Sequence, residues 1–148
     1  MKIDPHNNPF KAALYLVRDT NYNVFLTGRA GTGKTTFLQY LKKNCKKKMV
    51  VAAPTGVAAV NAGGMTLHSL FQIQPSVYPP NDPRLQRVAK GAEKISIYNH
   101  FKLNESRKKL LKEMELLVID EISMVRCDLL DVVDKVLRTF GGKAHLPF

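Results

Sequence analysis

With 148 residues, the chain is long enough for one domain with a hydrophobic core and too short for two sizeable ones. It is 45% hydrophobic, which excludes a disordered chain, and because it has neither an apolar run of roughly 20 residues nor a signal peptide we expect no membrane association and no secretion. The net charge of +11 is concentrated in residues 1–112, which suggests either a polyanionic partner such as nucleic acid or a solvated lysine surface.

The first half of the chain predicts helices and strands in alternation. Asn8 and Pro9 suit the cap and first turn of an opening helix, and a pair of glycines, Gly63 and Gly64, would end the last helix of this half. The predicted elements are helices at 8–17, 34–43 and 57–62 and strands at 24–27 and 49–53.

The second half is less regular. Four prolines exclude a long helix from part of residues 72–104, where we expect a long surface excursion with short helices. Residues 116–119 predict a third strand, and apolar residues at i, i+4, i+7, i+8 and i+11 predict a helix over 129–140. All three strands are continuously apolar, as in parallel sheets that are buried on both faces. We therefore predict a single partial α/β domain over residues 1–148, with a parallel sheet of about three core strands and flanking helices.

A glycine-rich segment, GRAGTGKT at residues 28–35, matches the pattern G-x-x-x-x-G-K-[ST] in full. It follows a predicted strand and opens a predicted helix, so its backbone N–H groups and the helix N-terminus would point at phosphate oxygens. Lys34 would reach the β- and γ-phosphates, and the Thr35 hydroxyl would bind Mg²⁺. The predicted nucleotide-binding residues are Gly28, Arg29, Ala30, Gly31, Thr32, Gly33, Lys34, Thr35 and Thr36.

Two adjacent carboxylates follow the third predicted strand, in the segment LLVIDEISMV at residues 116–125. In P-loop nucleotidases an acidic residue at the end of a neighbouring strand helps to hold Mg²⁺, and Asp120 is placed for that role. Glu121 leaves the strand end in another direction and would orient and deprotonate the attacking water. A phosphotransferase needs no such base, so the pair favours NTP hydrolysis. The alternative is that both acids only cap the segment that follows.

A second segment, VVAAPTGVAAVNAGGMTLHSLF at residues 50–71, runs from a strand through Pro-Thr-Gly into a helix of small residues. The Thr55 hydroxyl and the N–H groups that open this helix could bind phosphate, although tight packing of the helix on the sheet explains the alanines equally well. His68 is either a contact residue or an ordinary half-buried histidine.

The segments GRAGTGKTTF, APTGVAAVNAGG with TLHSLF, and LLVIDEISMV together resemble the Pif family of superfamily-one DNA helicases, relatives of the RecD helicase subunit. The resemblance covers residues 9–140. It implies a P-loop NTPase of RecA-like fold, the first of two motor domains, which uses ATP and Mg²⁺ to move 5′ to 3′ on single-stranded DNA. Lys34 and Glu121 would be the catalytic residues. The DNA-facing residues would be Pro54, Thr55, Gly56, Thr66, His68 and Ser69.

The chain departs from the family pattern in two ways. No glutamine stands upstream of Gly28 to contact the adenine edge, so Asn7, Asn8 or backbone groups would take that role. The chain also ends before the family's Gly-Asp…Gln-Leu-Pro-Pro motif, arginine fingers and second motor domain. We therefore expect an N-terminal piece of a longer helicase, whose exposed strand edge at residues 24–27 invites self-association. The alternative is a nucleotide- or nucleic-acid-binding module without motor activity.

Basic residues between Arg84 and Lys109 are further candidates for DNA contact. For the denser lysine run at residues 42–48 we favour a solvated helix end. Two unpatterned cysteines, Cys45 and Cys127, indicate a reducing compartment, which is the cytoplasm of a bacterium or the nucleus or mitochondrion of a eukaryote. The resemblance implies a role in genome maintenance, such as DNA repair, recombination or telomere maintenance.

Overall fold

The structure, a computed structural model, describes residues 7–88, 95–142 and 144–146. They belong to two compact units, Met1–Met49 and Val50–Phe148, which we call the first and second unit. Among the described residues, no helix is long and apolar enough to span a membrane.

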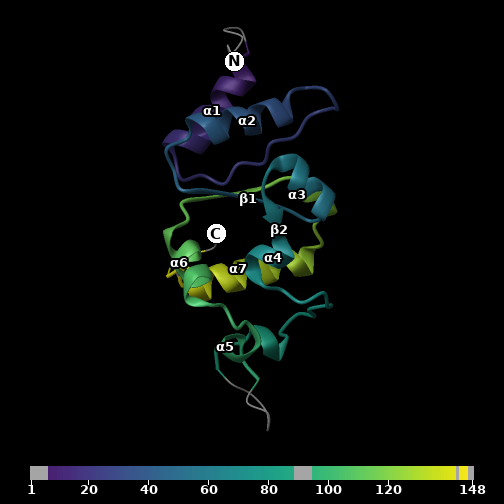
Figure 1. Ribbon diagram of the computed structural model, residues 1–148, viewed down its shortest axis with the longest axis vertical. Helices are drawn as coiled ribbons and strands as arrows, with labels where there is room; N and C mark the ends of the chain where they lie inside the picture. Colours follow the sequence, from purple (N-terminus) through teal and green to yellow (C-terminus); the bar gives the residue numbers. More distant parts are fainter. Residues whose placement is uncertain (1–6, 89–94, 143, 147–148) are drawn as a thin grey trace. The chain divides into compact units, whose positions relative to one another are not determined.

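The first unit contains helices α1 (Asn8–Asp19) and α2 (Lys34–Asn44) (Figure 1). Its core consists of Ala13, Phe37 and Leu41, with partly buried apolar residues packed around them. The Phe10 ring meets the rings of Phe37 and Tyr40 edge to face, with centroids 5.0 Å and 5.6 Å apart. Apolar residues at helical spacing on α1 and α2 therefore form this small core.

Both ends of α1 are capped by side chains. At its start, Asn7 Oδ1 accepts a hydrogen bond from Phe10 N at 3.0 Å, so the cap is one residue earlier than predicted. At its end, Lys47 Nζ donates to the carbonyl oxygens of Val17, at 2.8 Å, and Thr20, at 2.5 Å. One lysine of the basic run thus stabilises a helix C-terminus, where a positive charge is favourable.

The strand predicted at residues 24–27 is absent, because residues 20–29 form no regular secondary structure. The side chains of Phe25 and Leu26 are 75% and 41% exposed. A strand requires a partner for its N–H and C=O groups, and a short apolar run does not by itself specify one. The prediction of a sheet edge at 24–27 is therefore wrong, although the apolar side chains there are exposed.

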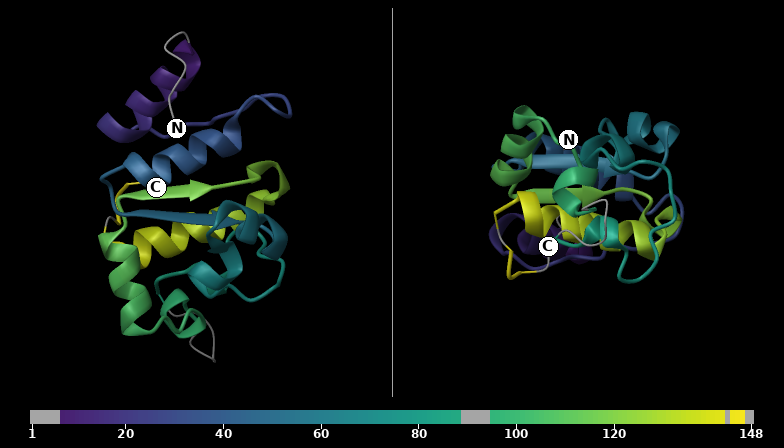
Figure 2. Two further views of the ribbon diagram at one scale, coloured as in Figure 1. Left: turned by 45° about the horizontal axis from the view of Figure 1, so that its top comes forward. Right: turned by 90° about the horizontal axis from the view of Figure 1, so that it is seen from below.

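The sheet has three strands in the order β2-β1-β3, namely β1 (Met49–Ala53), β2 (Met65–Thr66) and β3 (Leu116–Ile119). β1 and β2 are parallel, with Ala52 opposite Met65 and Ala53 opposite Thr66. β3 runs in the same direction as β1 (Figure 2), and Asp120 N donates to Ala52 O at 2.9 Å just beyond its end. The predicted three-stranded parallel sheet is confirmed, but β2 takes the place of the strand expected at 24–27.

Helices carry most of the second unit's core. They are α3 (Gly56–Ala62), α4 (Leu67–Phe71), α5 (Ile97–His100), α6 (Glu105–Glu113) and α7 (Cys127–Phe140), with 3-10 turns η1 (Pro83–Leu85) and η2 (Ile122–Met124). Helix α7 runs along one face of the β1–β3 pair (Figure 2). Its side chains Val132, Val133 and Val136 are fully buried, and the apolar spacing predicts this for Val133 and Val136 but does not include Val132.

A close backbone approach explains one of the two glycines after α3. A Cβ atom at Gly64 would lie 2.2 Å from the carbonyl oxygen of Val51 on β1. Gly63 adopts the left-handed conformation that ends α3, with φ of 61°. The glycine pair therefore ends the helix and lets the chain return against β1.

Residues 72–104 were expected to be a surface excursion, but the segment also contributes side chains to the main core. The segment does contain short helical turns, η1 and α5, as predicted. However, six of its side chains are buried in the main core: Ile73, Tyr78, Leu85, Ile97, Phe101 and Leu103. Because these residues are spread over turns and loops, they show no periodicity in the sequence that would predict their burial. Residues 89–94 of this segment lie outside the described residues.

Candidate functional site

The glycine-rich loop of the first unit contains two left-handed glycines and leads into α2. Gly31 and Gly33 adopt left-handed conformations, with φ of 78° and 91°, which other residues enter only with strain. Gly33 is the N-cap of α2, and no side chain in the described part of the chain caps that helix. The N–H groups at the start of α2 are therefore available to an anion.

Lys34 lies across this loop. Its Nζ donates to the carbonyl oxygens of Gly28 at 2.7 Å and Arg29 at 3.0 Å. The Thr32 hydroxyl also donates to Arg29 O, at 2.8 Å, and a Cβ atom at Gly28 would lie 2.6 Å from that hydroxyl oxygen. An ammonium group has three donors, so Lys34 keeps one for a ligand above the loop. The side chains that follow it, Thr35 and Thr36, are exposed and half-buried.

The acidic pair of the second unit stands where β3 ends. Asp120 Oδ1 accepts a hydrogen bond from Glu121 N at 3.0 Å, and Glu121 has a left-handed backbone with φ of 52°. The Glu121 carbonyl accepts from Met124 N at 3.0 Å, which closes the turn η2. A non-glycine residue in this conformation is uncommon and marks a position that the surrounding structure imposes.

Two threonines of the second unit cap the helices that follow β1 and β2. Thr55 Oγ1 accepts from Ala58 N at 3.2 Å at the start of α3. Thr66 Oγ1 accepts from Ser69 N at 3.1 Å at the start of α4. Each hydroxyl keeps its own proton, so capping does not prevent a further hydrogen bond to a ligand.

The sheet brings three of the sequence motifs to the end at which its strands finish. The segments 54–56, 66–69 and 120–121 lie at the carboxyl ends of β1, β2 and β3, which are neighbours in the sheet. Ligands of open α/β sheets bind outside the carboxyl ends of the strands. Within these segments Pro54, Thr55 and His68 are half-buried, while Gly56 and Ser69 are exposed.

A family model described as PIF1-like helicase matches residues 10–148. This chain belongs to the PIF1-like helicase family. The family predicted from the sequence motifs is thereby confirmed, and so is the RecA-like α/β fold that it implies.

Several relatives and solved structures of the family resemble the chain. The ATP-dependent DNA helicase PIF1 of Saccharomyces cerevisiae is 36% identical over 138 residues, which cover 88% of this chain and 14% of the yeast protein. The crystal structure of Bacteroides sp Pif1 with ADP-AlF4 is 44% identical with a TM-score of 0.76, and the match covers 95% of this chain and 31% of that one. Bacteroides Pif1 bound to ssDNA is 41% identical with a TM-score of 0.72, with coverage of 95% and 30%. The chain thus spans less than a third of the length of each of these relatives.

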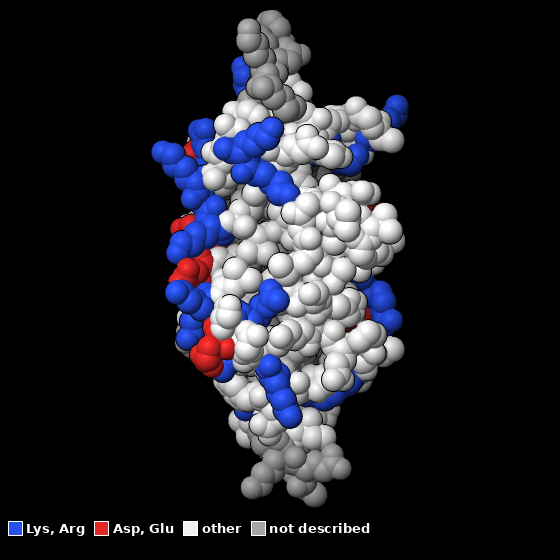
Figure 3. Space-filling view, in the orientation of Figure 1, with Lys and Arg blue, Asp and Glu red and all other residues white. Residues whose placement is uncertain are grey.

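Several basic residues that were candidates for DNA contact are already engaged in ion pairs. Lys108 pairs with Glu105 at 2.7 Å and Lys109 with Glu113 at 3.8 Å, and basic and acidic side chains lie next to each other over α6 (Figure 3). Arg84 pairs with Asp82 at 2.6 Å, although Asp82 is only 3% exposed. These three basic residues are therefore weaker candidates for phosphate contact than the sequence suggested.

Sequence analysis missed the cluster around Arg84. The guanidinium also donates to Ser76 Oγ at 3.0 Å and Val77 O at 2.7 Å, and lies 4.4 Å from the centre of the Tyr78 ring. Hydrogen bonds from Arg84 hold the pKa of the Asp82 carboxyl below its usual value. Among positions 76–84, only the short Asp-Pro-Arg sequence hinted at such a pairing.

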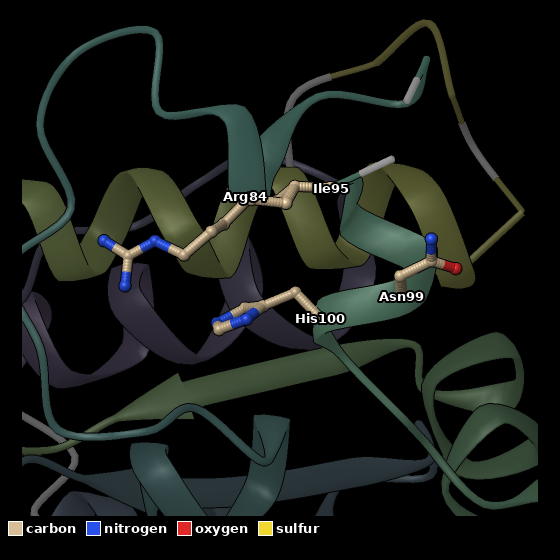
Figure 4. Close-up of a pocket in the computed structure, with 4 residues that line it drawn as sticks. All are labelled: Arg84, Ile95, Asn99 and His100. Carbon is tan, nitrogen blue, oxygen red and sulfur yellow. The ribbon is translucent and has the colours of Figure 1, made fainter. Parts of the chain in front are cut away.

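A small pocket of about 250 Å³ adjoins this cluster and is lined by Arg84, Ile95, Asn99 and His100 (Figure 4). The polar ends of Arg84 and His100 point to the same side, while the Asn99 amide points away from them. Burial lowers the pKa of His100, and the positive charge of Arg84 adds to that effect. The Tyr78 hydroxyl lies 3.4 Å from His100 Nε2 and donates to Gln74 O at 3.1 Å. Because these groups satisfy one another, the cluster anchors the segment rather than offering reactive groups.

Proposed function

We propose that this chain is the ATP-binding portion of a 5′-to-3′ DNA helicase motor, which hydrolyses ATP to drive translocation on single-stranded DNA in the complete protein. One observation carries the proposal. A chain of the PIF1-like helicase family has a loop with left-handed Gly31 and Gly33 that opens the uncapped helix α2. Such a loop presents backbone N–H groups and the positive end of a helix dipole to phosphate oxygens.

In this proposal residues 28–36 bind the phosphates of ATP. The carbonyl oxygens of Gly28 and Arg29 hold the Lys34 ammonium over the loop, so that its remaining proton reaches the β- and γ-phosphates. Positive charge at this position stabilises the charge that develops on the phosphoryl oxygens during transfer.

The proposed Mg²⁺ ligands are the Thr35 hydroxyl and the Asp120 carboxylate. Among the described residues, no three His, Cys, Asp or Glu side chains form a group that could hold a metal ion. In proteins Mg²⁺ is bound by one or two carboxylates together with waters and substrate phosphates. The bound ion would neutralise charge on the phosphates. Glu121, with its backbone turned away from the strand direction, would accept a proton from the attacking water.

The proposed DNA contacts are at the carboxyl ends of β1 and β2. Thr55, Thr66 and Ser69 offer hydroxyl donors. A Cβ at Gly56 would meet no described atom within 4 Å beyond its chain neighbours and its own helix backbone, which leaves room for a phosphate or sugar. Pro54 and His68 complete the set. The structure of Bacteroides Pif1 bound to ssDNA, which is 41% identical to this chain, supports single-stranded DNA as the partner.

The first test concerns nucleotide binding by the chain itself. Replacing Lys34 by Ala should lower the affinity for Mg-ATP at least about tenfold, because a charge-assisted contact to phosphate contributes about 1.5–3 kcal/mol. Titration calorimetry would measure it, with Lys43→Ala as the matched control that removes an exposed lysine of the same helix. Equal affinity of the Lys34 variant and the control would contradict the proposed role of the loop.

The second test concerns hydrolysis in the complete gene product. Glu121→Gln should abolish ATP turnover and retain nucleotide binding, because the amide keeps the size of the side chain but cannot accept the proton. ATP hydrolysis would be followed with and without single-stranded DNA. Retained turnover would rule out Glu121 as the base. If single-stranded DNA does not change the rate of ATP hydrolysis by the unaltered protein, a binding module is favoured over a motor.

The remaining parts of the proposal concern partners and compartment. A second motor domain of the same polypeptide would supply the arginine fingers, so the chain alone should bind nucleotide and not unwind DNA. Light scattering of the chain tests self-association, for which exposed Phe25 and Leu26 are the candidate surface. The compartment would be the cytoplasm of a bacterium or the nucleus or mitochondrion of a eukaryote.

A further inference from the structure

A basic groove of about 360 Å³ lies between the segment after η1 and the last turns of α7. The end of η1 and the segment after it line the groove with Leu85, Arg87 and Val88, and α7 lines it with Lys135, Arg138 and Thr139. Lys135 and Thr139 stand two to three helical turns from the start of α7, so the groove is distant along the helix from the carboxyl end of β3. Arg87 is one of the basic residues between Arg84 and Lys109 that the sequence made candidates for DNA contact, whereas no motif includes the groove residues of α7.

Most of the positive charge in this groove is uncompensated. Arg138 pairs with Asp134 at 2.7 Å, but Arg87 and Lys135 have no acidic partner within the described residues. Arg87 Nη2 donates to Arg138 O at 3.1 Å, which also satisfies a carbonyl near the end of α7. An isolated pair of cations beside a hydroxyl is a binding arrangement for an oxyanion.

We propose that the groove binds a phosphate group of a nucleic-acid strand, as a contact additional to those at the carboxyl ends of β1 and β2. This inference rests on the proposed function, which makes single-stranded DNA the partner. Arg87 and Lys135 neutralise the phosphate, and Thr139 donates a hydrogen bond to it. The contact carries no sequence information, because it is made to the backbone and not to base edges.

The lining distinguishes this ligand from a free nucleotide. Among the described lining residues there is no aromatic ring on which a base could stack, and the apolar side chains are the aliphatic Leu85, Val88 and Ala144. A nucleoside would leave its base without a stacking surface, whereas a backbone phosphate needs only charge and donors. The groove therefore suits the phosphodiester of a strand whose bases lie elsewhere.

The experiment compares two variants that lose the same charge. Arg87→Ala/Lys135→Ala removes the groove cations, and Lys43→Ala/Lys46→Ala removes two exposed lysines of the first unit. Binding of fluorescein-labelled oligothymidylate is measured by anisotropy over a range of salt concentrations. Each lost phosphate contact should reduce the magnitude of the slope of log K against log salt by about 0.7, so the groove variant, which loses one such contact, should show a slope smaller by about 0.7 while the control keeps its slope.

Two further measurements keep the result interpretable. Lys135→Glu is tested as well, because Lys135 is exposed and has no ion pair to lose within the described residues, and it should weaken binding more than Lys135→Ala. Thermal melting checks that Arg87→Ala, which loses its bond to the Arg138 carbonyl, is still folded. Competition with inorganic phosphate should displace DNA only at high concentration if the strand supplies the phosphate.

The outcomes separate the two proposals. An unaltered chain that binds no oligothymidylate would contradict both the proposed function and the groove. If the unaltered chain binds and the groove variants keep its affinity and salt slope, the groove proposal alone is wrong. Displacement by inorganic phosphate at low concentration would instead show that the groove binds a free anion, which also overturns the assignment to a strand.

Discussion

The two units hold their motif residues by different means. In the first unit, loop residues 28–32 are exposed and are shaped by glycine conformations and by the bonds of Lys34 and Thr32 to loop carbonyls. In the second unit, the motif residues follow directly after the strands of a sheet, and the unit that contains this sheet has a large buried core. The geometry of the loop in the first unit is therefore set locally, whereas the geometry of the motif residues in the second unit depends on core packing. Substitutions in the two units should therefore differ in their effect on stability.

The largest effect is expected for a core substitution in the second unit. Phe71 on α4 is fully buried, so Phe71→Ala should lower the free energy of unfolding by about 3–5 kcal/mol. Urea titration followed by far-ultraviolet circular dichroism measures this, since the chain has no tryptophan. Val60→Ala is the control, because Val60 is 79% exposed on α3. A loss as small as that of the control would show that the motifs of the second unit do not depend on this core.

A smaller effect on the free energy of unfolding is expected in the first unit, where one lysine of the run at residues 42–48 bonds the end of α1. Lys47→Ala removes two hydrogen bonds to carbonyls at the end of α1 and should cost about 1 kcal/mol, because such bonds are partly replaced by water. Its neighbour Lys46 is exposed, so Lys46→Ala should change the free energy of unfolding by less than about 0.5 kcal/mol. The same urea titration serves both. Equal effects would mean that Lys47 is as solvated as the rest of the run.

The same contrast explains how much of the fold could be predicted from sequence. The elements β1, β3, α2 and α7 were predicted closely because each carries its own signal in an apolar run, a motif or helical periodicity. β2 has only two residues, and its existence depends on the register that places Met65 opposite Ala52. The apolar run at 24–27 has the composition of a strand without the pairing. Composition is local, whereas pairing is not, so the sheet's membership could not be predicted.

The candidate site shows a similar division. The motif spacing predicted a phosphate-binding loop at residues 28–35, which stays a prediction, and Gly31 and Gly33 in that loop have left-handed backbones. It could not show that Thr55 and Thr66 cap helices, or that buried Asp82 compensates Arg84. Counting charges along the sequence treats every Arg and Lys as available. Contacts made across the fold decide which of them are, and in the basic groove Arg87 and Lys135 have no acidic partner among the described residues.

The smallest expected effect concerns the pH dependence of the cluster in residues 72–104. Burial, and then the charge of Arg84, lower the pKa of His100 from its ordinary value of about 6.5, while the more weakly acting Asp82 opposes this. Below about pH 6.5 the unfolded chain therefore binds a proton that the folded chain does not, and stability falls as the pH drops. Above that pH His100 is neutral in both the folded and the unfolded chain, so its contribution to stability no longer changes with pH.

His100→Phe should remove this pH dependence while keeping an aromatic ring near Phe101, whose ring centroid lies 4.8 Å from that of His100. Melting temperatures would be compared between about pH 7.5 and about pH 5.5, a window above the ordinary pKa values of Asp and Glu, with exposed His145→Phe as the control. The difference between the two melting temperatures should shrink in the His100 variant and persist in the control. If it persists in both, the histidine is hydrated in solution, and the core of the second unit is less closed around residues 95–100 than its buried neighbours Ile97 and Phe101 imply.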